Sequence, residues 1–117
     1  MNNKLYDIAC ARSGDKGNGA NVGIIAYTAA GYKFLAEFLT AERVEQYFKR
    51  LGVGVVRRYE LPNLHAFNFI LPNILAGGGS RSLRIDAQGK VLGQALLEMK
   101  IDIPEDVYAV AQRPDPI

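Results

Sequence analysis

The chain has 117 residues, of which 49% are hydrophobic, and this size and composition are typical of a single domain with one buried core. The 14 basic and 12 acidic residues leave a formal net charge of only +2, so the composition disfavours a nucleic-acid-binding protein. No stretch approaches the roughly 20 consecutive apolar residues of a membrane span, and the N-terminus lacks a signal-peptide pattern, so we expect a cytoplasmic protein that does not bind membranes.

The N-terminal part of the sequence predicts two strands separated by a polar loop. Residues 4–10 (KLYDIAC) alternate between two faces, and residues 21–28 (NVGIIAYT) are short, apolar and β-branched, so each segment is predicted to be a strand. Between them, the polar, glycine-rich residues 12–21 (RSGDKGNGAN) are predicted to form a loop.

The clearest predicted element is a helix over residues 40–52 (TAERVEQYFKRLG). Thr40 is a suitable N-cap, and Gly52 is placed to end the helix. A stripe of apolar residues recurs at helical spacing: Val44, Tyr47, Phe48 and Leu51. We expect this stripe to face the core, and residues 33–39 (KFLAEFL) are predicted to form a short helix before it.

The C-terminal half predicts further strands and one segment of undecided type. Residues 53–61 and 64–71 alternate as strands around the turn-forming sequence LPN, and residues 81–85 (RSLRI) are also strand-like. Residues 91–100 fit a helix no better than a strand, so both alternatives stay open. The tail, residues 104–117, carries three prolines and is expected to be extended or frayed.

The order of the predicted elements is two strands, a helix, two strands and a mixed C-terminal part. This order predicts an α+β fold, namely a ferredoxin-like sandwich in which helices cover one face of a mostly antiparallel sheet. We expect a single domain over residues 1–117, with a core at about 5–103 and a tail at 104–117.

The polar loop is the first candidate site. It is not a P-loop, because Lys16 is followed by Gly17 and not by a hydroxyl residue that opens a helix, and its glycine spacing is only a loose variant of the dinucleotide pattern. Its glycines are expected to free backbone amides that bind an anion or a partner's polar group. The candidate binding residues are Arg12, Ser13, Gly14, Asp15, Lys16, Gly17, Asn18 and Asn21. The alternative is a self-satisfied surface loop in which Asp15 pairs with Lys16 or Arg12.

The second candidate site is the segment AGGGSRS at residues 76–82. Its glycines precede two hydroxyls and a guanidinium, a combination that can bind an anion, and its candidate residues are Gly78, Gly79 and Arg81. The alternative is a flexible turn. If the two glycine-rich segments meet at one end of the sheet, they strengthen each other as a site.

The remaining polar candidates are assigned structural roles. His65, the only histidine, is predicted to share a strand face with the neighbouring phenylalanines, and no nucleophile or second metal ligand can be placed beside it from the sequence. Cys10, the only cysteine, is predicted to be a buried, inert thiol, and a single cysteine excludes an intrachain disulfide. Turn and edge positions are expected for three asparagines: Asn63, Asn68 and Asn73.

Several motifs together resemble one known family. The segments IACARSGDKGNGANVGIIA, LTAERVEQYF, RYELPNLHAFNFIL and GGGSRSLRIDAQGK, in this order, resemble the C-terminal domain of the AtuA family of acyclic terpene utilisation proteins over residues 5 to about 103. In that family a much larger domain usually precedes this ferredoxin-like unit, and since the resemblance of this sequence covers the small unit alone, we expect a free-standing form. The positions that match the family's motif are Ser13, Gly14, Asp15, Lys16, Gly17, Asn21, Asn63, Asn68 and Arg81.

The resemblance implies a free-standing accessory or binding subunit in the catabolism of acyclic terpenes and isoprenoid acyl-CoA compounds, acting with a separately encoded AtuA-like large subunit. The alternative is a small stand-alone enzyme for an acyl-CoA or carboxylate substrate, in which Lys16 and Arg81 bind the anion and Asp15 is the general base. Asp15 and Lys16 are therefore the catalytic candidates. We expect no cofactor and no metal, and we expect a homo-oligomer, with a dimer as the simplest form.

Overall fold

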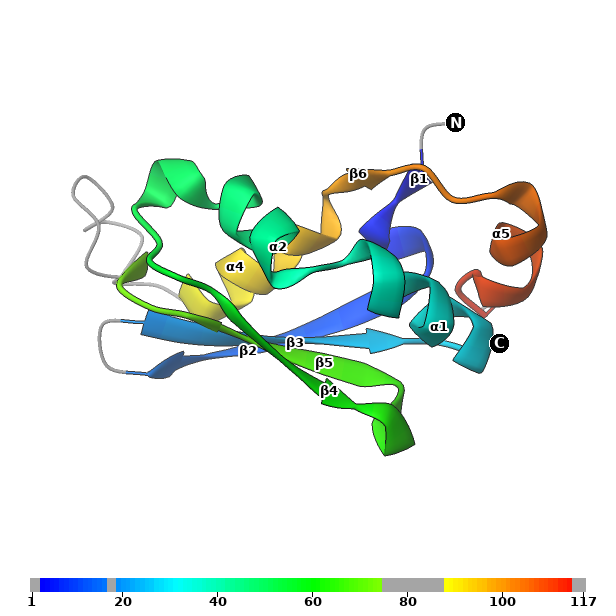
Figure 1. Ribbon diagram of the computed structural model, residues 1–117, viewed down its shortest axis with the longest axis horizontal. Coiled ribbons are helices and arrows are strands. Elements are labelled where there is room, and N and C mark those ends of the chain that lie inside the picture. Colours follow the sequence, from blue (N-terminus) through cyan, green and yellow to red (C-terminus); the bar gives the residue numbers. More distant parts are fainter. Residues whose placement is uncertain (1–2, 17–18, 75–87, 115–117) are drawn as a thin grey trace.

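The computed structural model of the chain describes residues 3–16, 19–74 and 88–114, and its centre is a four-stranded antiparallel sheet (Figure 1). Strands β2 and β3 form one hairpin and β4 and β5 form a second, and the strand order across the sheet is β2-β3-β5-β4. The strands are β2 (Ala9–Lys16), β3 (Gly19–Ala26), β4 (Arg57–Leu61) and β5 (Ala66–Leu71). A separate two-stranded sheet pairs β1 (Asn3–Lys4) with β6 (Lys100–Ile101).

The helices follow the hairpins in the chain. They are α1 (Ala29–Phe38), α2 (Ala41–Tyr47), α4 (Gln88–Leu97) and α5 (Glu105–Ala111). Short 3-10 turns occur at Leu5–Asp7, Lys49–Leu51 and Pro62–Leu64. Among the described residues, no helix is long and apolar enough to cross a membrane.

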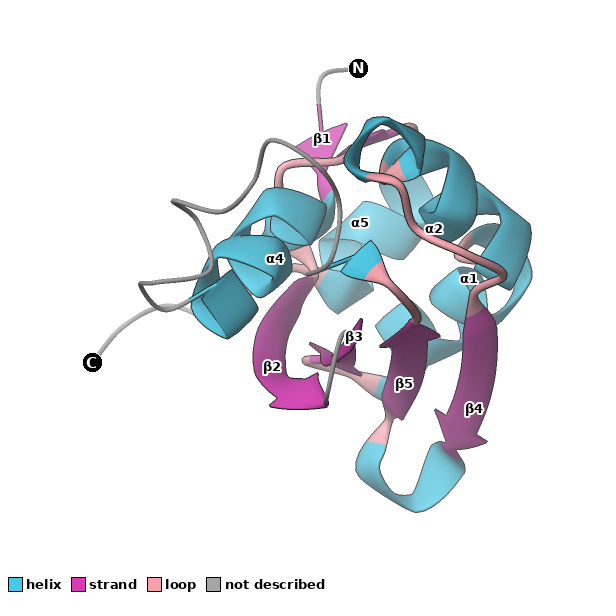
Figure 2. Cartoon of the chain, turned by 90° about the vertical axis from the view of Figure 1, so that its left-hand side faces the viewer, coloured by secondary structure: helices cyan, strands magenta, loops and turns pink. Residues whose placement is uncertain are grey.

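The helices lie on one face of the four-stranded sheet, and the other face carries no helix in the described part of the chain (Figures 1 and 2). Alternate residues of the two central strands point into the core, where Val22, Ile24, Phe67 and Phe69 are all 0% exposed. The intervening residues of the same strands are partly exposed, apart from the small residues Gly19 and Ala66. The α+β class, with helices on one face of an antiparallel sheet, is therefore confirmed.

The predicted strand over residues 4–10 is wrong for its first half, which forms a 3-10 turn. Leu5 and Ile8 are both fully buried, and this three-residue spacing suits a turn of helix and not the alternation of a strand. The backbone N–H of Lys4 donates to Oδ2 of Asp7 at 2.8 Å and fixes the turn.

The predicted polar loop at residues 12–21 is a second error, because most of it is a β-hairpin. Strand β2 continues to Lys16, and Arg12 and Gly14 pair with Gly23 and Asn21 of β3. This strand is difficult to recognise in the sequence because α4 packs very closely on β2. A Cβ on Gly93 of α4 would lie only 2.7 Å from Oγ of Ser13. Small residues therefore stand where a strand usually shows large apolar ones.

The helix around residues 40–52 is confirmed, although it is shorter than predicted. Oγ1 of Thr40 accepts a hydrogen bond from the N–H of Arg43 at 3.1 Å, α2 ends at Tyr47, and a 3-10 turn continues to Gly52 in a left-handed conformation (φ 78°). The short helix predicted at 33–39 is also present, but α1 begins earlier, at Ala29.

The second hairpin is shorter than the sequence predicts. Strand β4 begins at Arg57 and not at residue 53, and a 3-10 turn leads to His65, whose φ of 53° is left-handed. His65 therefore precedes strand β5, which begins at Ala66, and is not part of the predicted strand. Its ring nevertheless lies on the same side as Phe67, since both rings neighbour Tyr32.

The C-terminal region differs most from the prediction. The undecided residues 91–100 belong mainly to helix α4, and the tail forms helix α5 in place of an extended segment. Pro104 occupies the N-cap of α5, so the prolines flank this helix without interrupting it. Ala111 of α5 is fully buried beside Gly31 of α1, so the tail is part of the domain. The strand predicted at residues 81–85 lies outside the described residues.

Candidate functional site

The uncovered face of the sheet contains a groove with a volume of about 590 Å³, which we call the open-face groove. It crosses all four strands and reaches the 3-10 turn that joins β4 to β5. Its lining residues are Arg12, Ser13, Gly14, Asn21, Gly23, Ile25, Tyr59, Leu61, Leu64, Ala66, Phe67 and Asn68.

Strand register places four of these residues in one row across the sheet. Arg12 pairs with Gly23, Gly23 with Asn68, and Asn68 with Tyr59. Directly paired residues of antiparallel strands point to the same face, so a guanidinium, a glycine, an amide and a phenol lie side by side on the uncovered face. The neighbouring row is apolar apart from the thiol of Cys10 and continues through Ile25, Ala66 and Leu61.

Gly23 forms the floor of the groove at the centre of this polar row. A Cβ atom at this position would lie 3.6 Å from the carbonyl oxygen of Arg12 and 3.8 Å from that of Phe67, which are ordinary contact distances. Its φ is not positive, so neither backbone conformation nor packing requires glycine. Glycine in a strand interior weakens the strand and marks a site where a ligand or another backbone approaches closely.

Two asparagines provide the amide groups of the groove. Nδ2 of Asn21 donates a hydrogen bond to Oδ1 of Asn68 at 3.2 Å, across strands β3 and β5. Gly14 leaves room for this arrangement, because a Cβ there would lie only 3.3 Å from Oδ1 of Asn21. Asn68 therefore lies on an inner strand, and the prediction that it occupies a turn or an edge is wrong.

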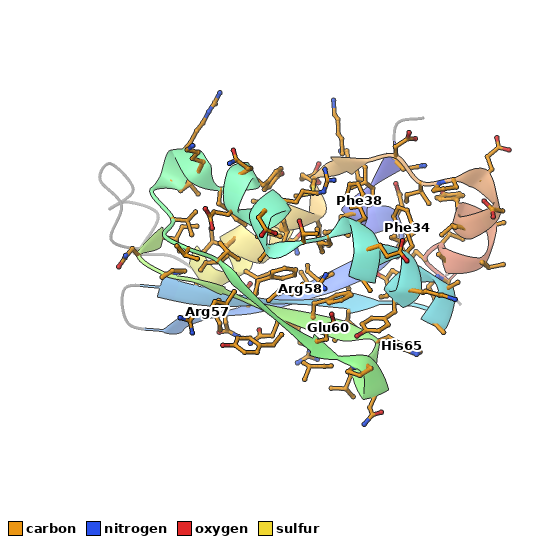
Figure 3. The ribbon with its side chains drawn as sticks, viewed as in Figure 1. Phe34, Phe38, Arg57, Arg58, Glu60 and His65 are labelled. Atoms are coloured by element: carbon orange, nitrogen blue, oxygen red, sulfur yellow. The ribbon has the colours of Figure 1, made fainter. Side chains whose placement is uncertain are left out.

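Charge on the uncovered face is positive in the described part of the chain. Arg12 is exposed and forms no ion pair with a described residue, and Arg57 is exposed on the edge strand β4. Its neighbour Arg58 points to the helix side, where Nη1 donates to the carbonyl oxygens of Ala36 and Leu39 at 2.9 and 3.0 Å (Figure 3). Arg58 also pairs with Glu60 at 2.8 Å, so it is a structural residue.

The structure brings together only part of the predicted site. Arg12, Gly14 and Asn21 line the open-face groove, whereas Ser13, although also at the groove, lies in the strand row that α4 covers. The catalytic candidates, Asp15 and Lys16, are the last residues of β2 and pair with Ala20 and Gly19. Five candidates lie outside the described residues: Gly17, Asn18, Gly78, Gly79 and Arg81.

Sequence reasoning missed three important groove residues: Gly23, Tyr59 and Leu64. A signal existed for Gly23, because an isolated glycine inside a strand pattern indicates a bulge or a close approach to the backbone. No comparable signal exists for Tyr59 and Leu64, since single exposed apolar residues are common on protein surfaces.

His65 and Cys10 lie outside the lining of the groove. The ring of His65 lies 5.9 Å from the ring of Tyr32, which in turn stacks on Phe67 at 4.7 Å. Cys10 is only half-buried, whereas the sequence predicted a buried thiol. Within the described residues, no group of three or more acidic, histidine or cysteine side chains could hold a metal ion.

Comparison with protein-family models gives a match to the AtuA ferredoxin-like domain over residues 3–102. No curated protein and no solved structure matches the chain. The family match covers both hairpins and helices α1, α2 and α4. The chain therefore belongs to the family of AtuA ferredoxin-like domains.

Proposed function

We propose that this chain is an accessory binding subunit, which holds a small ligand on the uncovered face of its sheet and works with a separately encoded large chain of the AtuA type. The observation that supports this function is the open-face groove, in which Gly23 leaves a gap between polar and apolar side chains. Acyclic terpene and isoprenoid acyl-CoA catabolism is the setting that the sequence resemblance implies.

The described lining of the groove suits binding better than catalysis. On the uncovered face it offers one guanidinium, two amides and a phenol, and the lining contains no carboxylate, imidazole or thiol. Such groups orient a ligand by hydrogen bonds, whereas general acid–base catalysis at neutral pH needs a group that exchanges a proton there. The alternative of a stand-alone enzyme depends on Asp15 as the base, at the end of strand β2.

The rim of the groove supports a role for a second chain. Tyr59, Leu61 and Leu64 are 49%, 42% and 65% exposed, and they lie together at the β4–β5 end of the groove. Apolar side chains gathered around a binding groove are typical of surfaces that a partner covers. A ligand in this groove stays open to solvent until a second chain closes over it.

Co-purification tests this function. The tagged chain, expressed at normal levels in its native host, is expected to retain an AtuA-like large chain. Leu64→Lys is expected to abolish this association, whereas Val110→Lys, which alters a 60% exposed residue of α5 outside the groove lining, is the matched control. Absence of any large chain would contradict the proposal, and turnover of isoprenoid acyl-CoA compounds by the isolated chain would favour the enzyme.

A further inference from the structure

We infer that the open-face groove binds an amphipathic monocarboxylate, with the carboxylate at Arg12 and the apolar part over Gly23, toward Leu61 and Leu64. This inference rests on the proposed binding function and adds the chemical class of the ligand. It depends on three properties of the described residues: the gap above Gly23, the charge of the uncovered face and the polarity of the two ends of the groove.

The gap above Gly23 gives the position of the ligand. Neighbouring strands of a sheet lie about 4.8 Å apart, so the backbones of Arg12 and Asn68, one strand away on either side, are roughly 10 Å apart. Gly23 places no side chain in this space, although a Cβ would fit there. A ligand lying on the floor therefore contacts the guanidinium on one side and the amide on the other.

The charge of the uncovered face favours an anion. Arg12 and Arg57 lie in strand positions that point to this face, and Glu60, the acidic residue of β4, pairs with Arg58 on the helix side. A second copy of the chain docked face to face would bring like charges together, which disfavours a dimer through this surface. An arginine fork matches a carboxylate, and one guanidinium with amide donors suits a single negative charge.

The two ends of the groove require an amphipathic ligand. The polar end consists of Arg12 with the hydrogen-bonded pair Asn21 and Asn68. The apolar end is lined by Ile25, Ala66, Leu61 and Leu64. A volume of about 590 Å³ lies within the usual range for small-molecule sites, so the ligand is larger than acetate.

Calorimetry with three probes that share one apolar chain tests this inference: octanoate, octanol and octylammonium. Octanoate is expected to bind the isolated chain at least tenfold more tightly than octanol, the effect of roughly one charge-assisted hydrogen bond. Octylammonium is expected not to bind. Arg12→Gln should remove the preference for octanoate over octanol, whereas Arg57→Gln, the matched loss of one cation on the same face outside the groove lining, should retain it.

Gly23→Val tests the position of the ligand, since it fills the floor at a site where a Cβ meets no close contact. We expect it to abolish octanoate binding without lowering the melting temperature, and Gly23→Ala, a smaller change, to weaken binding. Three results would overturn the inference. They are equal affinities for octanoate and octanol, equal effects of the two arginine variants on octanoate binding, and normal octanoate binding by both glycine variants. Loss of the large-chain complex with octanoate binding intact would overturn only the accessory-subunit role.

Discussion

Asn21 and Asn68 face each other diagonally across strands β3 and β5, and Nδ2 of Asn21 donates to Oδ1 of Asn68 at 3.2 Å. An asparagine amide has two donor hydrogens and a carbonyl acceptor, so one bond between the two residues leaves further groups for a ligand. This pair links the two hairpins on the uncovered face and fixes the polar end of the open-face groove.

Replacing Asn68 by aspartate is expected to abolish octanoate binding. The substitution preserves shape, and the carboxylate still accepts the hydrogen bond from Asn21, but it repels an anionic ligand beside Arg12. Asn73→Asp, in an exposed left-handed position outside the groove lining, is the matched control for the added charge. Calorimetry on both variants measures the effect, and similar affinities would argue against a carboxylate in the groove.

Two strand glycines are expected to respond oppositely to alanine. A Cβ on Gly19 would lie 2.7 Å from the carbonyl oxygen of Leu71 and 3.2 Å from Cα of Pro72, so the backbone must shift. Gly19→Ala is expected to cost about 1–3 kcal/mol of unfolding free energy. Gly23→Ala is expected to be neutral or stabilising by up to about 1 kcal/mol, because alanine restricts the unfolded chain. Urea denaturation compares them, and equal losses would contradict the packing around Gly23.

Arg58 is expected to be much more important for stability than Arg57. It donates to two carbonyls at the end of α1, pairs with Glu60, and its guanidinium lies 5.1 Å from the ring centre of Phe67. Arg58→Ala leaves those carbonyls without this donor and is expected to cost about 2–3 kcal/mol. Arg57→Ala, at an exposed site on the same strand, is expected to change stability by less than about 0.5 kcal/mol. Denaturant unfolding distinguishes the two.

Thr40→Ala is expected to destabilise the domain by about 1 kcal/mol, because it removes the oxygen that caps α2. Thr40→Ser retains that oxygen and is the control. Chemical denaturation measures both variants, and a loss for serine as large as that for alanine would indicate that the methyl group, and not the cap, is responsible.

Stability is expected to fall at alkaline pH through two tyrosines. Burial raises the pKa of Tyr27, and the positive charge of nearby Arg113 partly opposes this rise. Burial also raises the pKa of Tyr47, whose hydroxyl donates a hydrogen bond to the carbonyl oxygen of Ala95 at 2.6 Å. Above the ordinary pKa of about 10, the unfolded chain loses these protons first, so it binds fewer protons than the native state. The stabilisation is therefore complete below this pH and is lost as pH rises through the raised values.

Unfolding curves measured from about pH 8 to pH 11 give the size of this loss. Tyr27→Phe is expected to make the alkaline decline shallower, because phenylalanine has no proton to lose. Tyr59→Phe, which alters a 49% exposed tyrosine that does not affect the pKa of Tyr27, is the control. An identical decline in wild type and Tyr27→Phe would show that Tyr27 does not contribute.

The sequence by itself determined the features that depend on local chemistry. Neighbouring residues specify three such features, which can therefore be predicted from the sequence. They are the cap at Thr40, the apolar spacing that buries Val44 and Phe48, and the apolar run in β3. The order of hairpins and helices gave the α+β class for the same reason. The family motif also indicated part of the groove, since Gly14, Asn21 and Asn68 all line it.

Tertiary structure alone decided how these elements use their residues. Strand β2 resembles a loop because α4 packs so closely on it that only small residues fit, and α5 forms where Ala111 packs beside Gly31 of α1. Gly23 acquires its role only when Arg12 and Asn68, 56 positions apart in the chain, lie on either side of it. Strand register creates the groove, and no local sequence pattern specifies the register of distant strands.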